Sequence, residues 1–416
     1  MRSILAPALA LLAAAPLPGA ASAADDPPRV RVVALDGRVI RGDALVPMGT
    51  RLEVRLGDSG TALELSEVLE ATVEVPALPE PRGSVAAPAI EVEVVNGDLL
   101  RGTLVRGTGE TGFVVRHPAL GEVEVPLEIV GAVRFPAAWA KAVDPPPLRP
   151  GANEDRFLYL SGDRLDGTLR SVAPGEIRVR TEKGEDRTLR TDALLGFALV
   201  PLPRPPEAGV RVQAVLADGT RIGGASIAGD AKTWVLGKGV DGKDRPFPAS
   251  ALAGLAVRGG AGTVLSDLGE PKVEVRAYWG DDPPVLPLRP VLDRAFTLDP
   301  GSPPPIRLGG RTWLRGISMF SGTTATFDIA GKGFRSFAAA VGVDDAGPRG
   351  RVEFEVLLDG KSAWRSGVVG TVPLGGEPTA VPPIDVSSAK SLSLVVHAGP
   401  GDDVQDFADW VRPVLR

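Results

Sequence analysis

The sequence predicts an all-β protein in which four small β-barrels precede a larger antiparallel β-sandwich. Apolar and polar side chains alternate at residues 352–356 and 391–396, which is the period of a strand with one buried face. The composition favours turns, with 51 glycines and 40 prolines among 416 residues. A third observation is a glycine pattern that occurs four times between residues 30 and 258. Together these features predict short strands joined by tight turns.

The first 23 residues have the layout of a secretory signal peptide. Arg2 is followed by an apolar run over residues 4–17, and the small residues Ala21-Ser22-Ala23 suit cleavage after Ala23. A membrane anchor is the alternative, but the run is shorter than a bilayer span and contains two prolines. We therefore expect export to the periplasm, the cell envelope or the medium, with no membrane span after cleavage.

Composition excludes several classes of protein. The chain has no cysteine, which excludes disulfides, a cysteine nucleophile, thiolate metal sites and a lipidated cysteine. The formal charge is −6, and acidic and basic residues are interspersed without basic runs. The sequence therefore predicts no nucleic-acid partner, and it leaves apolar cores as the source of stability.

Four repeats occupy the chain from residue 29 to residue 258. Each has an Asx-Gly or Ser-Gly turn, and a second glycine follows the first by five residues. The glycine pairs are Gly37 with Gly42, Gly97 with Gly102, Gly162 with Gly167, and Gly219 with Gly224. We expect the turn to start a hairpin and the second glycine to let the next strand bend or bulge. Bent hairpins closed by a short strand describe a small SH3-like or Sm-like barrel, although a different small β-module stays possible.

A later glycine marks the end of three repeats. Gly131, Gly196 and Gly254 come just before or within a final apolar strand, and the first repeat has Glu70 in that place. We interpret this glycine as a tight turn before the closing strand. Proline-rich segments at 76–88, 136–153 and 201–207 predict semi-rigid spacers between the repeats. The predicted domains are the signal peptide (1–23), the repeats (29–75, 89–136, 155–201 and 209–258) and the sandwich (264–416).

The C-terminal segment contains six motifs in a recognisable order. They are residues 308–313, 316–321, 337–345, 359–367, 389–392 and 406–410, the last reading Asp406-Phe407-Ala408-Asp409-Trp410. In this order they resemble the NPCBM family of carbohydrate-binding modules, from about Leu265 to the C-terminus. The resemblance implies a jelly-roll sandwich related to galactose-binding domains. It also implies non-catalytic sugar binding, with galactose-type glycans as candidate ligands.

Two aromatic residues depart from the pattern of that family. Phe320 and Phe407 stand where the family usually has histidine. If those histidines bind a ligand, specificity here is altered or lost; if they form a buried pair, two phenylalanines repack the core. We favour the second interpretation, because two matched replacements indicate a contact between the positions.

Sugar binding requires aromatic faces for the apolar side of a pyranose and polar groups for its hydroxyls. The ligand-binding candidates are Trp313, Phe320, Trp364, Arg365, Asp406, Asp409 and Trp410. The alternative is structural: these tryptophans and Trp279 belong to the core, and Arg365 forms an ion pair with Asp406 or Asp409. We lean toward the structural interpretation for the tryptophans and for the ion pair.

The chain offers little for catalysis. Its only histidines, His117 and His397, are far apart in sequence, so we expect no Ser-His-Asp triad and no histidine metal site. The Asp344-Asp345 turn could hold a structural calcium through its oxygens, and we expect no other cofactor. The sequence predicts an exported, non-enzymatic glycan-binding protein whose repeats act as a spacer or as an array that contacts envelope proteins. The alternative is a structural or assembly protein of the cell envelope whose sandwich binds proteins.

Overall fold

The computed structural model describes residues 29–74, 90–139, 141, 148–202, 209–276, 288–297, 303–401 and 404–416. Strands account for 59% of the residues and helices for 6%, which confirms the prediction of an all-β fold. The predicted signal peptide and Trp279 lie outside the described residues, as does part or all of each proline-rich segment. Within the described ranges, no helix has the length and apolar character that crossing a bilayer requires.

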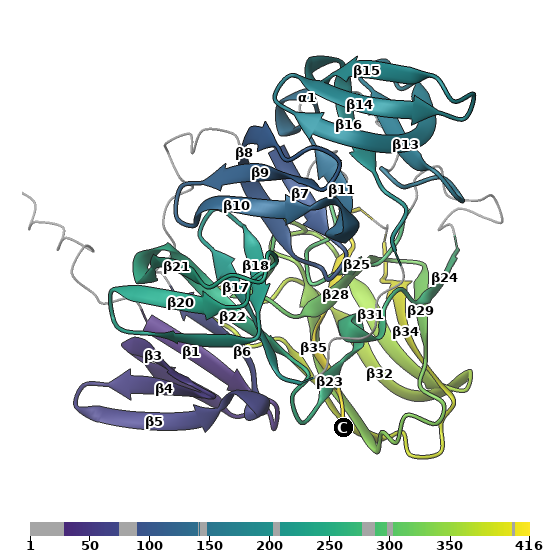
Figure 1. Cartoon of the computed structure of the whole chain (residues 1–416). Helices are drawn as coiled ribbons and strands as arrows, with labels where there is room; N and C mark the ends of the chain where they lie inside the picture. Colours follow the sequence, from purple (N-terminus) through teal and green to yellow (C-terminus); the bar gives the residue numbers. More distant parts are fainter. Residues whose placement is uncertain are drawn as a thin grey trace, which may run out of the picture.

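The described chain up to residue 258 forms four units of similar strand order (Figure 1). Units 1 and 4 have six strands, and units 2 and 3 have five, because one long second strand takes the place of two. In each unit the first strand pairs with the second and with the last, and a 3₁₀ turn precedes the last strand. A bent hairpin closed by a short last strand is the arrangement expected of a small SH3-like or Sm-like barrel. The domain boundaries given above stay a prediction.

The strands of the four units are as follows. Unit 1 contains β1 (Arg29–Ala34), β2 (Val39–Gly42), β3 (Ala44–Gly49), β4 (Arg51–Leu56), β5 (Ser59–Glu64), η1 (Leu65–Glu67) and β6 (Val68–Glu74). Unit 2 contains β7 (Ile90–Val94), β8 (Leu99–Gly107), β9 (Gly112–His117), β10 (Gly121–Pro126), η2 (Leu127–Ile129) and β11 (Val130–Arg134), and α1 (Pro136–Trp139) follows it. Unit 3 contains β12 (Asp155–Tyr159), β13 (Arg164–Ala173), β14 (Glu176–Thr181), β15 (Asp186–Arg190), η3 (Thr191–Ala193) and β16 (Leu194–Ala198). Unit 4 contains β17 (Arg211–Leu216), β18 (Arg221–Gly224), β19 (Ser226–Gly229), β20 (Thr233–Gly237), β21 (Arg245–Pro248), η4 (Ala249–Ala251) and β22 (Leu252–Arg258).

The first two glycines of the pattern have the roles expected of them, as unit 2 illustrates. Gly97 has φ +87°, a conformation that a side chain strains, so it closes the turn between β7 and β8. Gly102 lies where β8 bends onto β9, and a Cβ there would come within 2.4 Å of the Arg116 carbonyl oxygen. The bend of β8 therefore requires the absence of a side chain.

The interpretation of the third glycine as a tight turn is wrong. Gly196 and Gly254 lie inside the last strands β16 and β22, and the tight turn before each strand is the 3₁₀ segment. A Cβ at Gly196 would lie 2.2 Å from the Val133 carbonyl oxygen of unit 2, and one at Gly254 would lie 2.6 Å from the Ala71 carbonyl oxygen of unit 1. These glycines let strands of neighbouring units approach each other.

The units are consequently joined edge to edge. The proline-rich segments instead predict units that semi-rigid spacers hold apart. Antiparallel pairing joins β6 to β22, β8 to β18 and β11 to β16, which puts strands of all four units in one 16-stranded sheet. The remaining strands of units 1 and 4, β3–β5 and β19–β21, form a separate six-stranded sheet. Units 2 and 4 also exchange equivalent hydrogen bonds. The Gly223 N–H donates to Asp98 at 2.8 Å, and the Arg101 N–H donates to Thr220 Oγ1 at 3.3 Å. Backbone pairing of this kind restricts movement of one unit relative to the next.

The C-terminal domain is a sandwich of two antiparallel sheets, seen at the lower right of Figure 1. One sheet has the order β25-β28-β35-β30-β33, with β23 also paired to β35, and the other has the order β24-β29-β34-β31-β32. Phe337, Phe354 and Trp410 are among the buried side chains that fill the space between them. The strands and turn are β23 (Thr263–Val264), η5 (Leu265–Leu268), β24 (Lys272–Val275), β25 (Val291–Leu292), β26 (Ile306–Leu308), β27 (Arg311–Trp313), β28 (Gly316–Phe320), β29 (Thr323–Asp328), β30 (Ser336–Val343), β31 (Val352–Leu358), β32 (Lys361–Val369), β33 (Thr379–Asp385), β34 (Ser391–Ala398) and β35 (Phe407–Leu415).

Unit 1 packs directly against this sandwich. Glu70 of β6 is buried, and it accepts backbone N–H groups of Leu314 at 2.9 Å and Arg315 at 3.2 Å. The Arg31 guanidinium lies 3.7 Å from the Glu70 carboxylate and 4.1 Å from the centre of the Trp313 ring. Burial raises the pKa of Glu70, although Arg31 and the two N–H groups oppose that shift. Glu70, the residue that replaces the third glycine in repeat 1, thus connects unit 1 to the sandwich.

Candidate functional site

Two phenylalanine rings lie side by side where β28 ends and β35 begins. Phe320 and Phe407 are cross-strand partners, and their ring centroids are 6.1 Å apart. Phe296 packs against both rings, at 5.7 Å from Phe320 and 5.8 Å from Phe407. The contact that the matched replacements predict is therefore present. Both rings are half-buried, so each keeps surface for a ligand.

The turn before β35 holds Phe407 in place. Gln405 adopts φ +64°, a left-handed conformation that is uncommon for a residue with a side chain. Its Oε1 atom accepts the Arg349 N–H at 3.2 Å, and its carbonyl oxygen accepts the Phe407 N–H at 2.7 Å. Asp406 is fully buried below the turn, and its Oδ1 accepts the Arg351 N–H at 3.0 Å. Strained backbone of this kind is found preferentially at functional sites.

A buried acidic network lies close to the ring pair. Asp344 accepts the N–H groups of Arg307 at 3.0 Å and Ala346 at 2.8 Å, and Asp345 accepts those of Gly309 and Gly310, both at 2.8 Å. Burial raises the pKa of Asp409 well above its usual value, and the charge of Asp344 adds to that shift. Backbone donors thus occupy the turn that could hold calcium. The described residues include no group of three histidine, cysteine or acidic side chains suited to a metal ion.

Arg365 lies on the other sheet, and its partners are glutamates. Its guanidinium lies 3.0 Å from Glu355 and 3.6 Å from Glu353, so the expectation of an aspartate partner is wrong. His397 Nε2 lies 2.7 Å from the same Glu355 carboxylate. Burial favours neutral Glu355, but hydrogen bonds from Arg365, Ser362 and His397 outweigh it and lower the pKa of Glu355 to about 2. The sequence could not indicate this cluster, because its members come from three strands.

The structure does not bring the seven predicted ligand contacts together. Trp313, Asp406, Asp409 and Trp410 are each 0% exposed, so they have no surface through which a sugar could touch them. Trp313 lies at the junction with unit 1, where the guanidinium groups of Arg31 and Arg412 lie 4.1 Å and 4.9 Å from the centre of its ring. Trp364 is half-buried, with its ring 6.4 Å from that of Trp410. Only Phe320, Trp364 and Arg365 keep accessible surface.

Comparison with known families identifies the C-terminal domain. The family model of the NPCBM/NEW2 domain matches residues 287–416. Residues 287–416 form an NPCBM/NEW2 domain. The match includes both strands that carry the ring pair, β28 and β35. Comparison of the whole chain with curated protein sequences gives no match.

Solved structures similar to this chain contain CBM51 modules. One is CBM51 of Clostridium perfringens GH95 in complex with methyl-galactose, with 21% identity, a TM-score of 0.30, and coverage of 38% of this chain and 100% of that one. A second comprises the CBM51-2 and INT domains of Clostridium perfringens ZmpB in complex with GlcNAc, with 18% identity, a TM-score of 0.30, and coverage of 47% and 43%. A third contains the tandem CBM51 modules of a Streptococcus pneumoniae family 98 glycoside hydrolase, with 10% identity, a TM-score of 0.29, and coverage of 78% and 87%. The chain thus spans less than half of the second of these structures. Likenesses of this degree carry no information about the site of the NPCBM domain.

Proposed function

We propose that this chain is an exported, non-catalytic protein that binds carbohydrate through its NPCBM domain. The observation that carries the proposal is the family match, which covers the strands on which the accessible ring pair lies. Candidate ligands are galactose-type glycans, as the resemblance to the NPCBM family implies.

The ligand-contacting surface in this proposal is the ring pair of Phe320 and Phe407. Half-buried aromatic rings offer a face to the apolar C–H side of a pyranose, and neighbouring polar groups bind its hydroxyls. Gln405, two residues before Phe407, carries a side-chain amide of this kind, whose oxygen accepts the Arg349 N–H. Binding is reversible and forms no covalent bond.

The absence of catalysis in this proposal has support from the two histidines. His117 is buried between units 2 and 4, where Nδ1 accepts the N–H groups of Ala119 and Leu120 and Nε2 lies 2.9 Å from Asp218. His397 is bound to Glu355. Both imidazoles therefore make structural hydrogen bonds, and neither lies beside the ring pair.

The units serve in this proposal as a rigid support for the NPCBM domain and as a surface for envelope proteins. Their paired strands and the Glu70 junction argue against a flexible spacer. Unit 1 also exposes three apolar side chains, Val39, Met48 and Leu56. Such side chains suit contact with a protein.

The test is a glycan array on the full chain, with and without added calcium, followed by titration calorimetry on any glycan that binds. Phe320→Ala and Phe407→Ala should each weaken binding at least tenfold, which corresponds to about 1.4 kcal/mol. Phe334→Ala is the matched control, because Phe334 is also half-buried but lies away from the ring pair. Phe320 comes just before the start of β29, whereas Phe334 comes after its end.

Two results would contradict the proposal. Equal loss of affinity in Phe334→Ala would show that the ring pair is not the contact surface. A folded chain that binds no glycan would favour the alternative, a structural or assembly protein of the cell envelope whose sandwich binds proteins.

A further inference from the structure

Units 2 and 4 meet through the same edge, one copy from each unit. Leu99 of β8 is the register partner of Arg221 of β18. Each of these residues lies two positions after the glycine of its turn, Gly97 in unit 2 and Gly219 in unit 4. The two edges therefore meet in antiparallel order, and the turn of each unit faces the second strand of the other.

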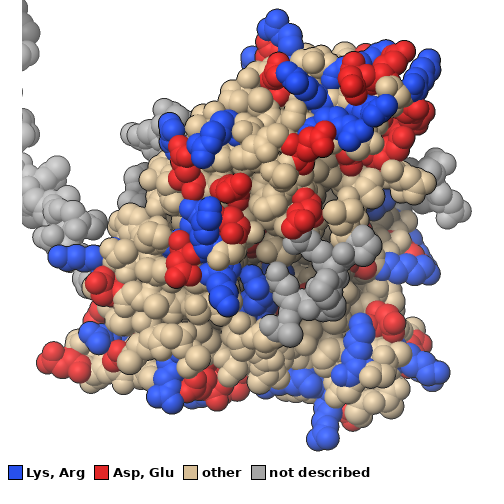
Figure 2. Space-filling model, viewed as in Figure 1, with Lys and Arg blue, Asp and Glu red and all other residues tan. Residues whose placement is uncertain are grey.

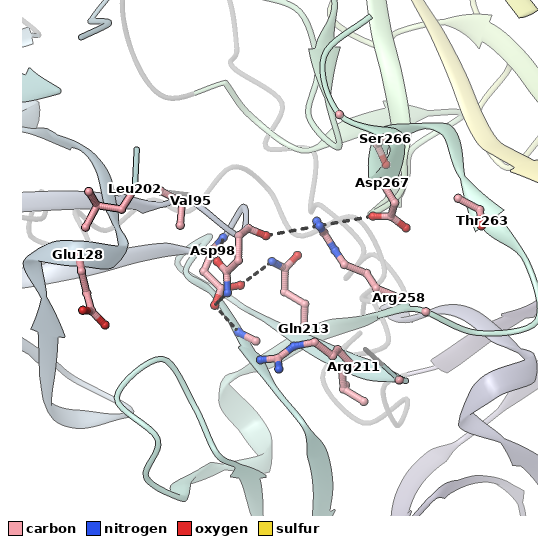
Figure 3. A pocket seen from close by; sticks show the side chains of 16 residues that line it. Val95, Asp98, Glu128, Leu202, Arg211, Gln213, Arg258, Thr263, Ser266 and Asp267 are labelled. Atoms are coloured by element: carbon pink, nitrogen blue, oxygen red, sulfur yellow. Dashed lines mark hydrogen bonds and ion pairs between the residues drawn. The ribbon is translucent and has the colours of Figure 1, made fainter. Parts of the chain in front are cut away.

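Polar side chains of the two turns complete this contact. Thr220 Oγ1 accepts the Arg101 N–H at 3.3 Å, and Asp98 accepts the Gly223 N–H at 2.8 Å. Gln213 of unit 4 also donates to Asp98, at 2.8 Å (Figure 3). In both directions, the residue directly after the turn glycine thus accepts an N–H group from the fourth position after the glycine of the other unit.

The corresponding edges of units 1 and 3 lie at the surface. Leu99 and Arg221 are 1% and 5% exposed in the contact, whereas Val39 of unit 1 is 41% exposed and Arg164 of unit 3 is also exposed. Strand β2 ends the order of the 16-stranded sheet, and residues 164–166 pair only with β12 among the described strands. In Figure 1 unit 1 lies at the lower left and unit 3 at the top, so the two edges are at opposite ends of the row of units.

Along this edge unit 1 is similar to unit 2, and unit 3 is similar to unit 4. Two positions after the turn glycine, units 1 and 2 have an aliphatic residue and units 3 and 4 have arginine. In the order of the units, these residues are Val39, Leu99, Arg164 and Arg221. Four positions after the glycine, units 1 and 2 both have arginine, Arg41 and Arg101. The two exposed edges therefore carry the residues of the two edges that already bind each other.

Charge favours the pairing of unit 1 with unit 3. At the first and fourth positions after the turn glycine, unit 1 has Arg38 and Arg41, and unit 3 has Asp163 and Asp166. These two positions of opposite units are neighbours in the contact of units 2 and 4. Two copies of unit 1 would bring arginines together and two copies of unit 3 would bring aspartates together, whereas unit 1 with unit 3 places opposite charges side by side.

The present partners of these charged side chains do not prevent such a contact. The ion pairs are Arg38 with Asp36, Arg41 with Glu377, and Asp166 with Arg156. Each of the six side chains is at least 25% exposed, and ion pairs in contact with solvent contribute little stability. Asp163 accepts the Ser161 hydroxyl at 2.9 Å, and a carboxylate has further lone pairs for an N–H group.

We propose that unit 1 of one copy of this chain binds unit 3 of a second copy through the contact that joins units 2 and 4. Val39 then pairs with Arg164 of the second copy, and Asp163 of that copy accepts the Arg41 N–H. The contact joins two different surfaces at opposite ends of the molecule, so copies associate head to tail into open chains. This inference goes beyond the proposed function and does not depend on it, because the association requires no sugar.

The test is sedimentation velocity of the full chain from about 1 μM to about 100 μM. The upper concentration is needed because separate copies lack the covalent linkage that supports the contact of units 2 and 4. The weight-average mass of the unaltered chain should rise past that of a dimer. Arg41→Glu and, separately, Asp163→Arg should each stay monomeric, because each places like charges together. Unit 1 already has arginine at the position of Asp163, so the turn accepts this side chain.

An equimolar mixture of the two variants distinguishes the head-to-tail contact from symmetric ones. The Arg41→Glu chain keeps the edge of unit 3 and the Asp163→Arg chain keeps that of unit 1, so the mixture should form a dimer and nothing larger. A dimer of this kind also shows that both variants are folded. Arg51→Glu and Glu176→Arg are the matched controls, because both side chains are exposed members of ion pairs in the same two units and should associate like the unaltered chain.

Four results would overturn the proposal. The unaltered chain could stay monomeric at every concentration. One variant could stay monomeric while the other forms a dimer by itself, which would show that two identical edges bind each other. The mixture could stay monomeric although circular dichroism shows both variants folded. The two control variants could lose association as fully as Arg41→Glu and Asp163→Arg do.

Discussion

Glu70→Ala should destabilise the whole chain, because it breaks the junction between unit 1 and the sandwich. The Glu70 carboxylate accepts the Leu314 and Arg315 N–H groups and lies 3.7 Å from the Arg31 guanidinium. Arg31 is only 1% exposed, so the substitution leaves its positive charge buried without that carboxylate. Removing one partner of a buried ion pair typically costs about 3–5 kcal/mol.

A matched substitution isolates the effect of burial. Glu64 lies in the same unit and pairs with Arg51, but both side chains are exposed. An exposed ion pair contributes about 0–1 kcal/mol, so Glu64→Ala should change little. Glu70→Gln should cost less than Glu70→Ala, because the amide oxygen still accepts the two N–H groups even though the charge that faces Arg31 is lost.

The assay is urea denaturation followed by circular dichroism, with calorimetry to show whether the sandwich and the units unfold together. We expect Glu70→Ala to lower the denaturation midpoint clearly more than Glu64→Ala does. It should also separate one unfolding transition into two. The reasoning fails if both alanine variants have the same midpoint, since Glu70 would then contribute no more than a surface glutamate.

Three further predictions concern the sandwich and the units. The pKa of Glu355 is lowered to about 2, so its ionised form stabilises the fold above pH 4.5. Up to about 3 kcal/mol of the free energy of unfolding should be lost as the pH falls from 4.5 to 2. Acid denaturation of Glu355→Gln should lack this dependence on pH. Gly254→Ala should lower the stability measured by thermal denaturation by at least about 1–3 kcal/mol, because its Cβ would lie 2.6 Å from the Ala71 carbonyl oxygen. Gly370→Ala is the control and should be close to neutral, because the atom nearest to its Cβ lies 3.8 Å away. Trp410→Ala should cost about 3–5 kcal/mol because the ring is fully buried against Phe354, and a smaller loss for Trp410→Ala than for Trp364→Ala would contradict this placement.

Positive and negative charges are mixed on the visible surface of the molecule. Figure 2 shows lysine and arginine interspersed with aspartate and glutamate over the face in view. Among the described residues, exposed ion pairs such as Arg190 with Asp192 and Arg106 with Glu122 place opposite charges next to each other. On this face the positive charges are therefore compensated by neighbours.

Local patterns in the sequence determined the class of the fold. Alternation at 352–356 and 391–396 predicts strands because side chains of a strand point to opposite faces, and β31 and β34 lie there. The glycine pairs predict bent hairpins because a turn and a close approach each act over a few residues. The motif order was sufficient to identify the C-terminal domain.

Only the tertiary structure decided which side chains reach the surface and how the units are joined. The sequence could not show that Trp313 and Trp410 are buried, since a tryptophan in a strand suits either a core or a binding face. It could not show that Gly196 and Gly254 serve pairing between units, because the carbonyl groups that they admit come from residues far away in the chain. The contact between units 2 and 4 likewise depends on residues of long sequence separation, such as Asp98 and Gln213. Periodicity and turn chemistry are local properties, whereas burial and junctions depend on how distant segments pack.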